Sequence, residues 1–124
     1  MSALDAWELK LLEGWEDVFK RGQLTFWVLL ALRDGPKHMA EIRQWLTDIG
    51  DGALTVEERS LYRALQRFHD SELVKSTSVS GNRGPDRKVY ELSPIGERVL
   101  VAFIERDIRL FLRPEVTRLL KSHT

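Results

Sequence analysis

Polar and aromatic side chains recur at helical spacing near the middle of this 124-residue chain. If residues 56–70 form a helix, four of them share one face: Arg59, Tyr62, Arg63 and Gln66. Arginine binds guanine or phosphate through paired hydrogen bonds, glutamine can pair with adenine, and a tyrosine hydroxyl can bind phosphate. These four residues, the reading face, therefore predict contact with nucleic acid. The alternative interpretation is an ordinary solvated helix face rich in arginine.

A second group of polar and basic residues lies in the stretch SVSGNRGPDRKVYEL, residues 78–92. It contains Asn82, Arg83, Arg87 and Lys88, beside two glycines and a proline. The formal net charge of the chain is zero, yet residues 59–88 hold seven basic and three acidic residues. A local positive surface attracts polyanions within a Debye length of about 8 Å. The alternative is a solvated face whose cations pair with nearby acids.

The reading face requires a helix whose opposite side is apolar. The residues that follow the spacing of a core-facing side are Leu61, Ala64, Leu65 and Phe68. Thr55 comes three residues before Glu58, and this T-x-x-E pattern predicts a capping box at the start of the helix.

Further helices and a hairpin are predicted around this segment. Apolar residues at intervals of three and four predict an amphipathic helix over 4–19. The apolar run LTFWVLLAL, residues 24–32, predicts a buried helix that Gly35-Pro36 ends, and residues 39–46 predict a third helix. The segments LVKSTSVS and RKVYEL predict two strands joined by the loop GNRGPD.

Three helices followed by a hairpin with a basic tip is the order of a winged helix-turn-helix. The expected fold class is therefore mostly α with a small β-hairpin. In that arrangement the reading helix enters the major groove of DNA, and the hairpin, or wing, lies along the backbone or minor groove. The order favours DNA binding over the solvated-face interpretation, because it places the reading face and the basic loop together.

The C-terminal segment predicts a dimer. Ser93 as N-cap and Pro94 at the first position open a long helix that is expected to end near Arg113. Its apolar residues exceed what one small domain can cover, which usually indicates a partner. The expected homodimer interface comprises Trp7, Leu11 and Trp15 of the first helix and Leu100, Phe103, Ile104, Ile108 and Phe111 of the last.

Such a dimer would place two reading helices about 34 Å apart, so double-stranded DNA with a pseudo-palindromic operator is the expected partner. The domain organisation expected from these elements is an N-terminal arm over 1–20, a DNA-binding domain over 21–92 and a C-terminal dimerisation helix and tail over 93–124. The alternative function is a winged-helix module that binds proteins and no DNA.

Composition argues against several other classes. The chain has no cysteine and three histidines, and it contains no phosphate-binding loop or G-x-S-x-G motif. His69 and Glu72 are spaced for a metal, but two ligands are too few. No apolar run reaches the roughly 20 residues of a membrane span. We therefore expect a cytoplasmic protein that is not an enzyme, with no metal, cofactor or membrane partner.

Three stretches resemble PadR-type transcriptional regulators: RGQLTFWVLLALRDGPKHMAEI, SLYRALQRF and GNRGPDRKVYELSPIGERVL. The resemblance covers about residues 21–100 and implies a homodimeric repressor with a single C-terminal helix. By position it implies that Ser60, Tyr62 and Arg63 contact DNA and that Arg83, Arg87 and Lys88 belong to the wing. It also implies a hydrophobic or aromatic small-molecule effector near the dimer interface. The sequence departs from the family pattern at Met39-Ala40, where Gly-Tyr is usual, and at Glu72, where glycine is common.

Overall fold

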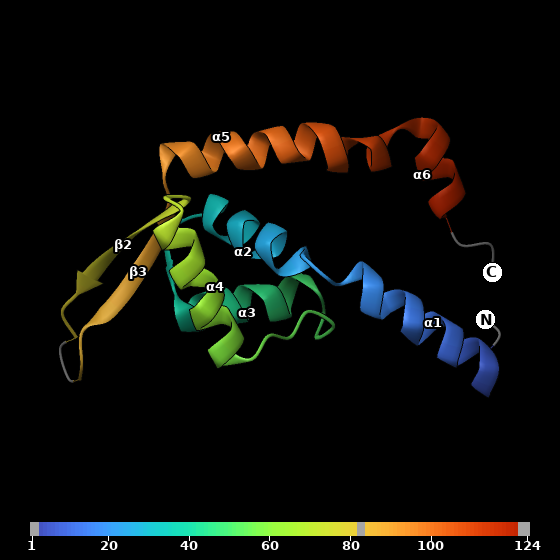
Figure 1. Ribbon diagram of the computed structural model, residues 1–124, viewed down its shortest axis with the longest axis horizontal. Helices are drawn as coiled ribbons and strands as arrows, with labels where there is room; N and C mark the ends of the chain where they lie inside the picture. Colours follow the sequence, from blue (N-terminus) through green and yellow to red (C-terminus); the bar gives the residue numbers. More distant parts are fainter. Residues whose placement is uncertain (1–2, 82–83, 122–124) are drawn as a thin grey trace.

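The computed structural model describes residues 3–81 and 84–121, which form helices and one small sheet. The sheet has three antiparallel strands in the order β1-β3-β2. Figure 1 shows α2, α3 and α4 grouped beneath α5, with the wing at one end and α1 projecting from the other. The elements are α1 (Ala6–Phe19), α2 (Gln23–Arg33), β1 (Lys37–His38), α3 (Met39–Ile49), α4 (Glu58–Asp70), β2 (Val74–Val79), β3 (Arg87–Leu92), α5 (Pro94–Phe103), the π-helix η1 (Ile104–Ile108), the 3₁₀-helix η2 (Arg109–Leu112) and α6 (Pro114–Leu120).

A single apolar core holds α2, α3 and α4 together. The core side chains predicted for α4 are all buried, which confirms the orientation of that helix: Leu61, Ala64, Leu65 and Phe68. They pack with residues of α2 and α3, among them Val28, Leu32, Ile42 and Leu46. The predicted winged helix-turn-helix is therefore confirmed, and its reading helix is fixed by burial of one face.

The predicted capping box at Thr55 is wrong. Helix α4 begins at Glu58 with Glu57 as N-cap, and no side chain in the described part of the chain caps it. Residues 54–57 belong to no helix or strand, and the backbone of Glu57 is extended. Leu54 and Val56 pack against the core, and the Val56 carbonyl accepts a hydrogen bond from Arg43 Nε at 3.2 Å. Glu58 lies in the first turn. Its negative charge stabilises the helix there by interacting with the helix dipole, although its side chain takes no part in a cap.

Two capping boxes do occur, at the starts of α1 and α3. In α1 the N-cap is Asp5 and its reciprocal partner is Glu8. In α3 the N-cap is His38, whose Nδ1 accepts from the Glu41 backbone N–H at 3.3 Å, while Glu41 Oε1 accepts from the His38 N–H at 3.0 Å. Histidine is an uncommon N-cap, so the sequence pattern H-x-x-E was not interpreted as a helix start.

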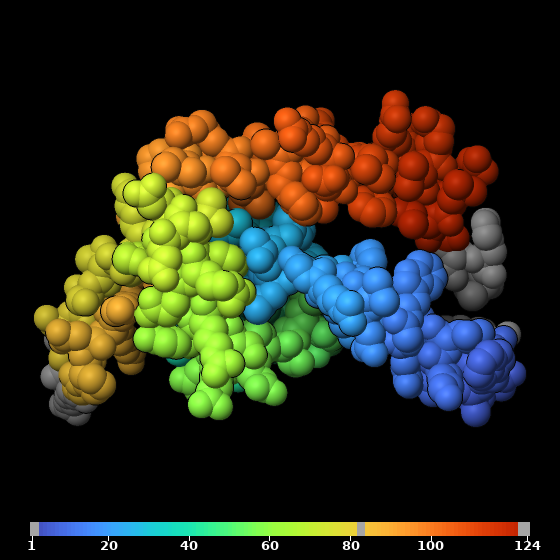
Figure 2. All heavy atoms as spheres, in the orientation of Figure 1, coloured from blue at the N-terminus to red at the C-terminus, as the bar shows by residue number. Residues whose placement is uncertain are grey.

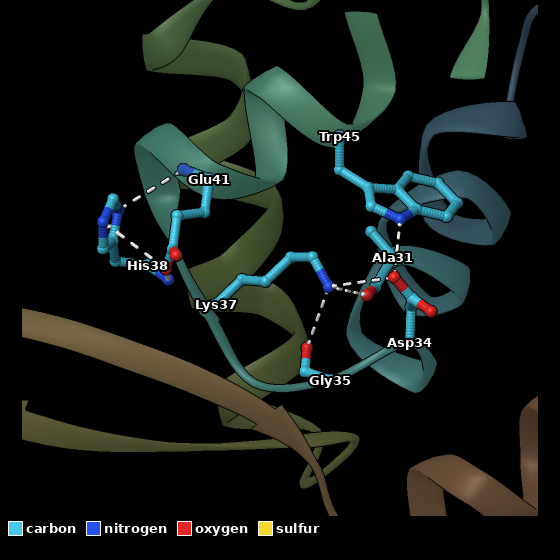
Figure 3. Close-up of polar contacts among 7 residues, drawn as sticks. All are labelled: Ala31, Asp34, Gly35, Lys37, His38, Glu41 and Trp45. Carbon is cyan, nitrogen blue, oxygen red and sulfur yellow. Dashed lines mark hydrogen bonds and ion pairs between the residues drawn. The ribbon is translucent and has the colours of Figure 1, made fainter. Parts of the chain in front are cut away.

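The two-residue strand β1 was not predicted, yet it joins the wing to the helices. Lys37 pairs with Tyr90 and His38 with Val89 of β3, while β2 and β3 pair from Val74↔Leu92 to Val79↔Arg87. Lys37 is anchored from the other side, because its Nζ donates to the carbonyls of Ala31 at 2.8 Å and Gly35 at 3.2 Å (Figure 3). The wing is therefore attached to the turn between α2 and α3.

The same turn is tied to α3 through Trp45 and Asp34. The indole Nε1 of Trp45 donates to Asp34 Oδ2 at 3.0 Å, and Lys37 Nζ lies 3.7 Å from that carboxylate oxygen (Figure 3). Trp45 is thus half-buried with its polar atom satisfied, as a structural tryptophan usually is.

The junction between the wing and α5 follows the sequence prediction. Ser93 is the N-cap, its Oγ accepts from the Gly96 N–H at 2.9 Å, and Pro94 occupies the first turn. The Ser93 hydroxyl also donates to the Glu72 carbonyl at 2.6 Å. Glu72 has a φ of +66°, a backbone conformation that glycine adopts without strain. Glu72, where the family commonly has glycine, is therefore a strained residue held by this contact.

The C-terminal helix runs to Leu112 but changes its winding after Phe103, from α through the π-helix η1 to the 3₁₀-helix η2. Arg113 is extended, as residues before proline usually are, and Pro114 starts the separate helix α6. The predicted end near Arg113 is confirmed, whereas α6 was not predicted.

Leu100 was predicted to lie at the dimer interface, and the structure contradicts this. Its side chain is 1% exposed and belongs to the core of its own chain, because the first turns of α5 pack on α2. By contrast, α1 buries none of its residues against the described part of the chain. In the space-filling view α1 and the C-terminal segment extend toward the same end of the molecule with open space between them (Figure 2).

We expect Gly96→Ala to destabilise the fold by about 2 to 3 kcal/mol, because an added Cβ would overlap the Leu73 carbonyl oxygen. The matched control is Gly14→Ala, where a Cβ meets no described atom within 4 Å and helix propensity improves. Urea unfolding followed by circular dichroism measures both. Equal stability of the two variants would contradict the close packing at Gly96.

Candidate nucleic-acid interface

The reading face lies on the solvent side of α4, opposite the four core residues. Arg59, Ser60, Tyr62 and Arg63 are exposed and Gln66 is half-buried. Gln66 Nε2 donates to the Tyr62 hydroxyl oxygen at 2.9 Å, which fixes the tyrosine ring and leaves its own hydroxyl hydrogen to be donated to a ligand. The structure thus brings all five predicted residues of α4 to one side of the molecule.

The wing contributes basic residues at the start of β3. Arg87 pairs with Val79 and Lys88 with Ser78, and both basic side chains are exposed. Asn82 and Arg83, which were predicted to belong to the same group, lie outside the described residues. In the described part of the wing, Arg87 and Lys88 therefore lie at the loop end of the hairpin, while Lys75 of β2 lies near the opposite end of the same ladder.

A cleft of about 410 Å³ lies between the reading face and the first residues of β3. It brings together Tyr62 of α4 with Arg87 and Lys88 of β3, which the sequence could only assign to separate elements. The residues that line it are His38, Met39, Ala40, Tyr62, Arg87, Lys88 and Tyr90. Sequence reasoning missed His38, Met39, Ala40 and Tyr90, because they reach the cleft through the unpredicted pairing of β1 with β3.

His38 occupies the side of the cleft next to α3. Its ring lies beside Glu41 (Figure 3), and its Nε2 is 3.4 Å from Nη1 of Arg87. The capping histidine of α3 and a basic residue of the wing therefore meet, although 49 positions separate them in the chain.

Tyr90 forms the buried floor of the cleft, with 5% of its surface exposed. Burial, and to a lesser extent the nearby Tyr62 phenol, raise the pKa of Tyr90 above its ordinary value of 10.0. Both effects disfavour a phenolate, so Tyr90 is a neutral phenol at physiological pH. The floor of the cleft consequently carries no negative charge from this side chain.

Apart from Leu100, the residues predicted to form the dimer interface differ in how much of each side chain is exposed. Trp7 and Trp15 are 64% and 72% exposed, and Leu11, Phe103 and Phe111 are also exposed. Ile104 and Ile108 are half-buried, and Ile104 packs against the core. The exposed members of the predicted interface therefore lie on α1, at the end of α5 and on η2.

Within residues 3–81 and 84–121, no helix combines the length and apolarity needed to cross a membrane. The same described residues contain no group of three or more His, Cys, Asp or Glu side chains placed to hold a metal ion.

Comparison with known proteins places the chain among transcriptional regulators. Residues 28–102 match the Transcriptional regulator PadR-like family. No curated protein sequence matches the chain. A PadR family transcriptional regulator from Eggerthella lenta is 26% identical with a TM-score of 0.69, and the alignment covers 92% of this chain and 96% of that one. A PadR-like transcription factor from Bacteroides fragilis is also 26% identical, with a TM-score of 0.67 over 86% of this chain and 98% of the other.

The fold is also that of Bacillus subtilis PadR in a complex with operator DNA. That protein is 18% identical, with a TM-score of 0.62, and the alignment covers 67% of this chain and 47% of that one. At this identity the likeness concerns the fold alone.

The raised pKa of Tyr90 predicts a loss of stability in alkali. The folded protein holds the Tyr90 proton more tightly than the unfolded chain, whose phenol ionises near pH 10.0. The contribution is therefore fully present below that pH and is lost as the pH rises toward the folded pKa. We expect the free energy of unfolding to fall less between about pH 9 and pH 11 in Tyr90→Phe than in the unaltered protein. Tyr62→Phe, at an exposed tyrosine, is the control, and an identical effect of both substitutions would contradict the assignment.

Proposed function

The chain belongs to the PadR-like family of transcriptional regulators, and from that premise we propose that it binds a specific operator in double-stranded DNA through α4 and the wing. One observation carries the proposal. Tyr62 of the reading face and the basic residues Arg87 and Lys88 of β3 border a common cleft, so a single DNA duplex can contact both elements. A winged helix docks in this way, with the reading helix in the major groove and the wing beside the adjacent backbone.

The residue types suit separate tasks at this surface. Arg59 and Arg63 offer planar guanidinium groups for guanine or phosphate, while Gln66 can pair with adenine once its bond to Tyr62 rearranges. Arg87 and Lys88 are placed to bind phosphates, which position the protein without reading sequence. Asn82 and Arg83, which the sequence places between β2 and β3, complete the proposed DNA-binding set. Glu57 and Glu58 lie at the start of α4. A carboxylate there can accept a hydrogen bond from the amino group of cytosine.

We propose that the binding species is a homodimer, with residues 1–20 as an arm, 21–92 as the DNA-binding domain and 93–124 as the C-terminal dimerisation segment. Large apolar side chains of α1 and η2 remain exposed in the single chain, including Trp7, Trp15 and Phe111. A second copy is the occupant that fits α1, because residues 5–19 hold five acidic residues and one basic residue, a charge that anionic lipid surfaces repel. A two-fold symmetric dimer would then bind a pseudo-palindromic operator.

We propose that the dimer acts in the cytoplasm as a repressor that a hydrophobic or aromatic molecule releases. An open pocket of about 310 Å³ supports an effector site. Lys20 and Trp27 line it from the α1 and α2 side, and Thr55 and Val56, which lead into α4, line the opposite side. A molecule bound there would touch both the dimerisation arm and the segment that positions the reading helix.

The test of DNA binding is selection of duplexes from a random library, followed by measurement of affinity as salt increases. Binding through several phosphates must weaken steeply between about 50 and about 200 mM salt. Failure to select any duplex, combined with capture of a protein partner, would instead favour the protein-binding alternative.

We expect Arg63→Ala to weaken binding to the selected operator by about tenfold or more, because one good base or phosphate contact contributes about 1 to 3 kcal/mol. The control is Arg118→Ala on α6, an exposed arginine at the opposite end of the molecule from the wing (Figure 1). Fluorescence anisotropy measures both variants. Unchanged affinity of Arg63→Ala would remove the reading face from the interface.

We expect Trp15→Glu to raise the dimer dissociation constant by at least about tenfold, because a buried tryptophan at an interface contributes about 2 kcal/mol or more. The fold of each chain should persist, since Trp15 is 72% exposed in the single chain. Val79→Glu, at an exposed valine of the wing, is the control. Sedimentation equilibrium distinguishes the two, and a dimer that survives Trp15→Glu unchanged would place the interface away from α1.

A further inference from the structure

We propose that the cleft between α3 and the wing binds one backbone phosphate of the DNA, held between Nε2 of His38 and the guanidinium of Arg87. This inference rests on the proposed function, and to the phosphate contact already proposed for Arg87 it adds a second donor from the start of α3. It assigns to His38, which the sequence offered only as an isolated histidine, a direct role in binding the DNA backbone.

The capping box determines where His38 carries its proton. Nδ1 accepts a hydrogen bond from the Glu41 backbone N–H at 3.3 Å, so this nitrogen must be unprotonated. A neutral imidazole whose Nδ1 accepts carries its hydrogen on Nε2. Nε2 is therefore a donor, and it lies 3.4 Å from Oε1 of Glu41 and 3.4 Å from Nη1 of Arg87 in β3.

A second donor meets it there. Arg87 Nη1 lies 3.4 Å from His38 Nε2, and a guanidinium has no atom that accepts a hydrogen bond. Two N–H donors cannot bond to each other, whereas an oxyanion placed beside both can accept from each. Oε1 of Glu41 also lies 3.4 Å from Nε2, but it accepts the shorter 3.0 Å bond from the His38 backbone N–H, so a phosphate oxygen would compete with this carboxylate for the Nε2 hydrogen.

The remaining polar groups of the cleft also match an anion. Lys88 adds a second positive charge, and the Tyr62 hydroxyl, which accepts from Gln66, keeps its hydrogen for a ligand. Tyr90 stays neutral because burial raises its pKa. None of the described residues that line the cleft is acidic, so Glu41 at its border is the carboxylate that a phosphate must approach.

The position of the cleft points to a phosphate of DNA rather than to a free ion. The cleft opens between Tyr62 on the reading face and the first residues of β3 in the wing. In the proposed docking, the DNA strand that separates the major from the minor groove passes between those elements. Arg87 is exposed and His38 is half-buried. An open site of this kind suits the extended backbone of DNA better than a small free anion, which would be enclosed.

Two substitutions at His38 separate this role from capping. In His38→Asn the side-chain oxygen replaces Nδ1 as the cap acceptor, since asparagine is a strong N-cap, but the donor at Nε2 is lost. In His38→Gln the amide nitrogen can take the place of Nε2 and the cap is lost. We expect His38→Asn to keep the melting temperature and bind DNA about tenfold more weakly, because a hydrogen bond to a charged group is removed. We expect His38→Gln to melt earlier and retain more of the affinity.

The probe is a short duplex of random sequence at low salt, because phosphate contacts do not depend on sequence. Arg87→Gln should weaken binding and reduce the slope of log affinity against log salt by about one. Its combination with His38→Asn should cost less than the sum of the two, since both side chains bind one phosphate. Arg118→Ala is again the control.

The outcomes are distinct. If the unaltered protein binds no duplex, both the proposed function and this inference are refuted. If the unaltered protein binds but His38→Asn binds equally well, or if affinity simply follows melting temperature across the His38 variants, the phosphate contact is refuted while the proposed function stands. If inorganic phosphate displaces the duplex from the unaltered protein, but not from His38→Asn, at matched ionic strength, the cleft is a site for free phosphate and the assignment to the DNA backbone is overturned.

Discussion

The pairing of β1 with β3 is the constraint on which the candidate interface depends. Two residues, Lys37 and His38, join the wing to the turn that precedes α3. Lys37 is held by carbonyls at the end of α2 and by Asp34, and His38 caps α3, so each residue belongs at once to the sheet and to the helical body. Without this strand the hairpin would be attached to the domain only at its two ends. With it, the middle of β3 is also joined to the helical body.

A second constraint acts through α4, which packs on one side and presents its polar residues on the other. Burial of Leu61, Leu65 and Phe68 leaves the helix no freedom to rotate about its axis, because each apolar side chain would lose contacts if it moved toward solvent. The reading face is therefore oriented by residues that never touch a ligand. The two constraints meet in the cleft, where Tyr62 of α4 faces Arg87 and Lys88 of β3.

The residues that sequence reasoning placed correctly are those governed by local periodicity. The core of α4, the hairpin and the Ser93-Pro94 helix start all follow from spacing or from the conformational preferences of single residues. The capping box at Thr55 failed because α4 begins at Glu58 with Glu57 as N-cap, after a segment in which Leu54 and Val56 pack against the core. Leu100 was assigned to a partner because the apolar stripe of its helix is continuous, although the first turns of the stripe serve the chain's own core and the later turns do not.

The sequence by itself determined which segments form helices and a hairpin, which face of α4 is apolar, and where positive charge gathers. These properties depend on neighbours within a few positions, so they can be read from one stretch at a time. Only the tertiary structure decided that β1 exists and that His38 meets Arg87 across 49 positions. It also decided which apolar residues stay exposed for a partner. Those outcomes depend on how separate elements pack. A strand of two residues has too little sequence of its own to predict that it forms or which strand it pairs with.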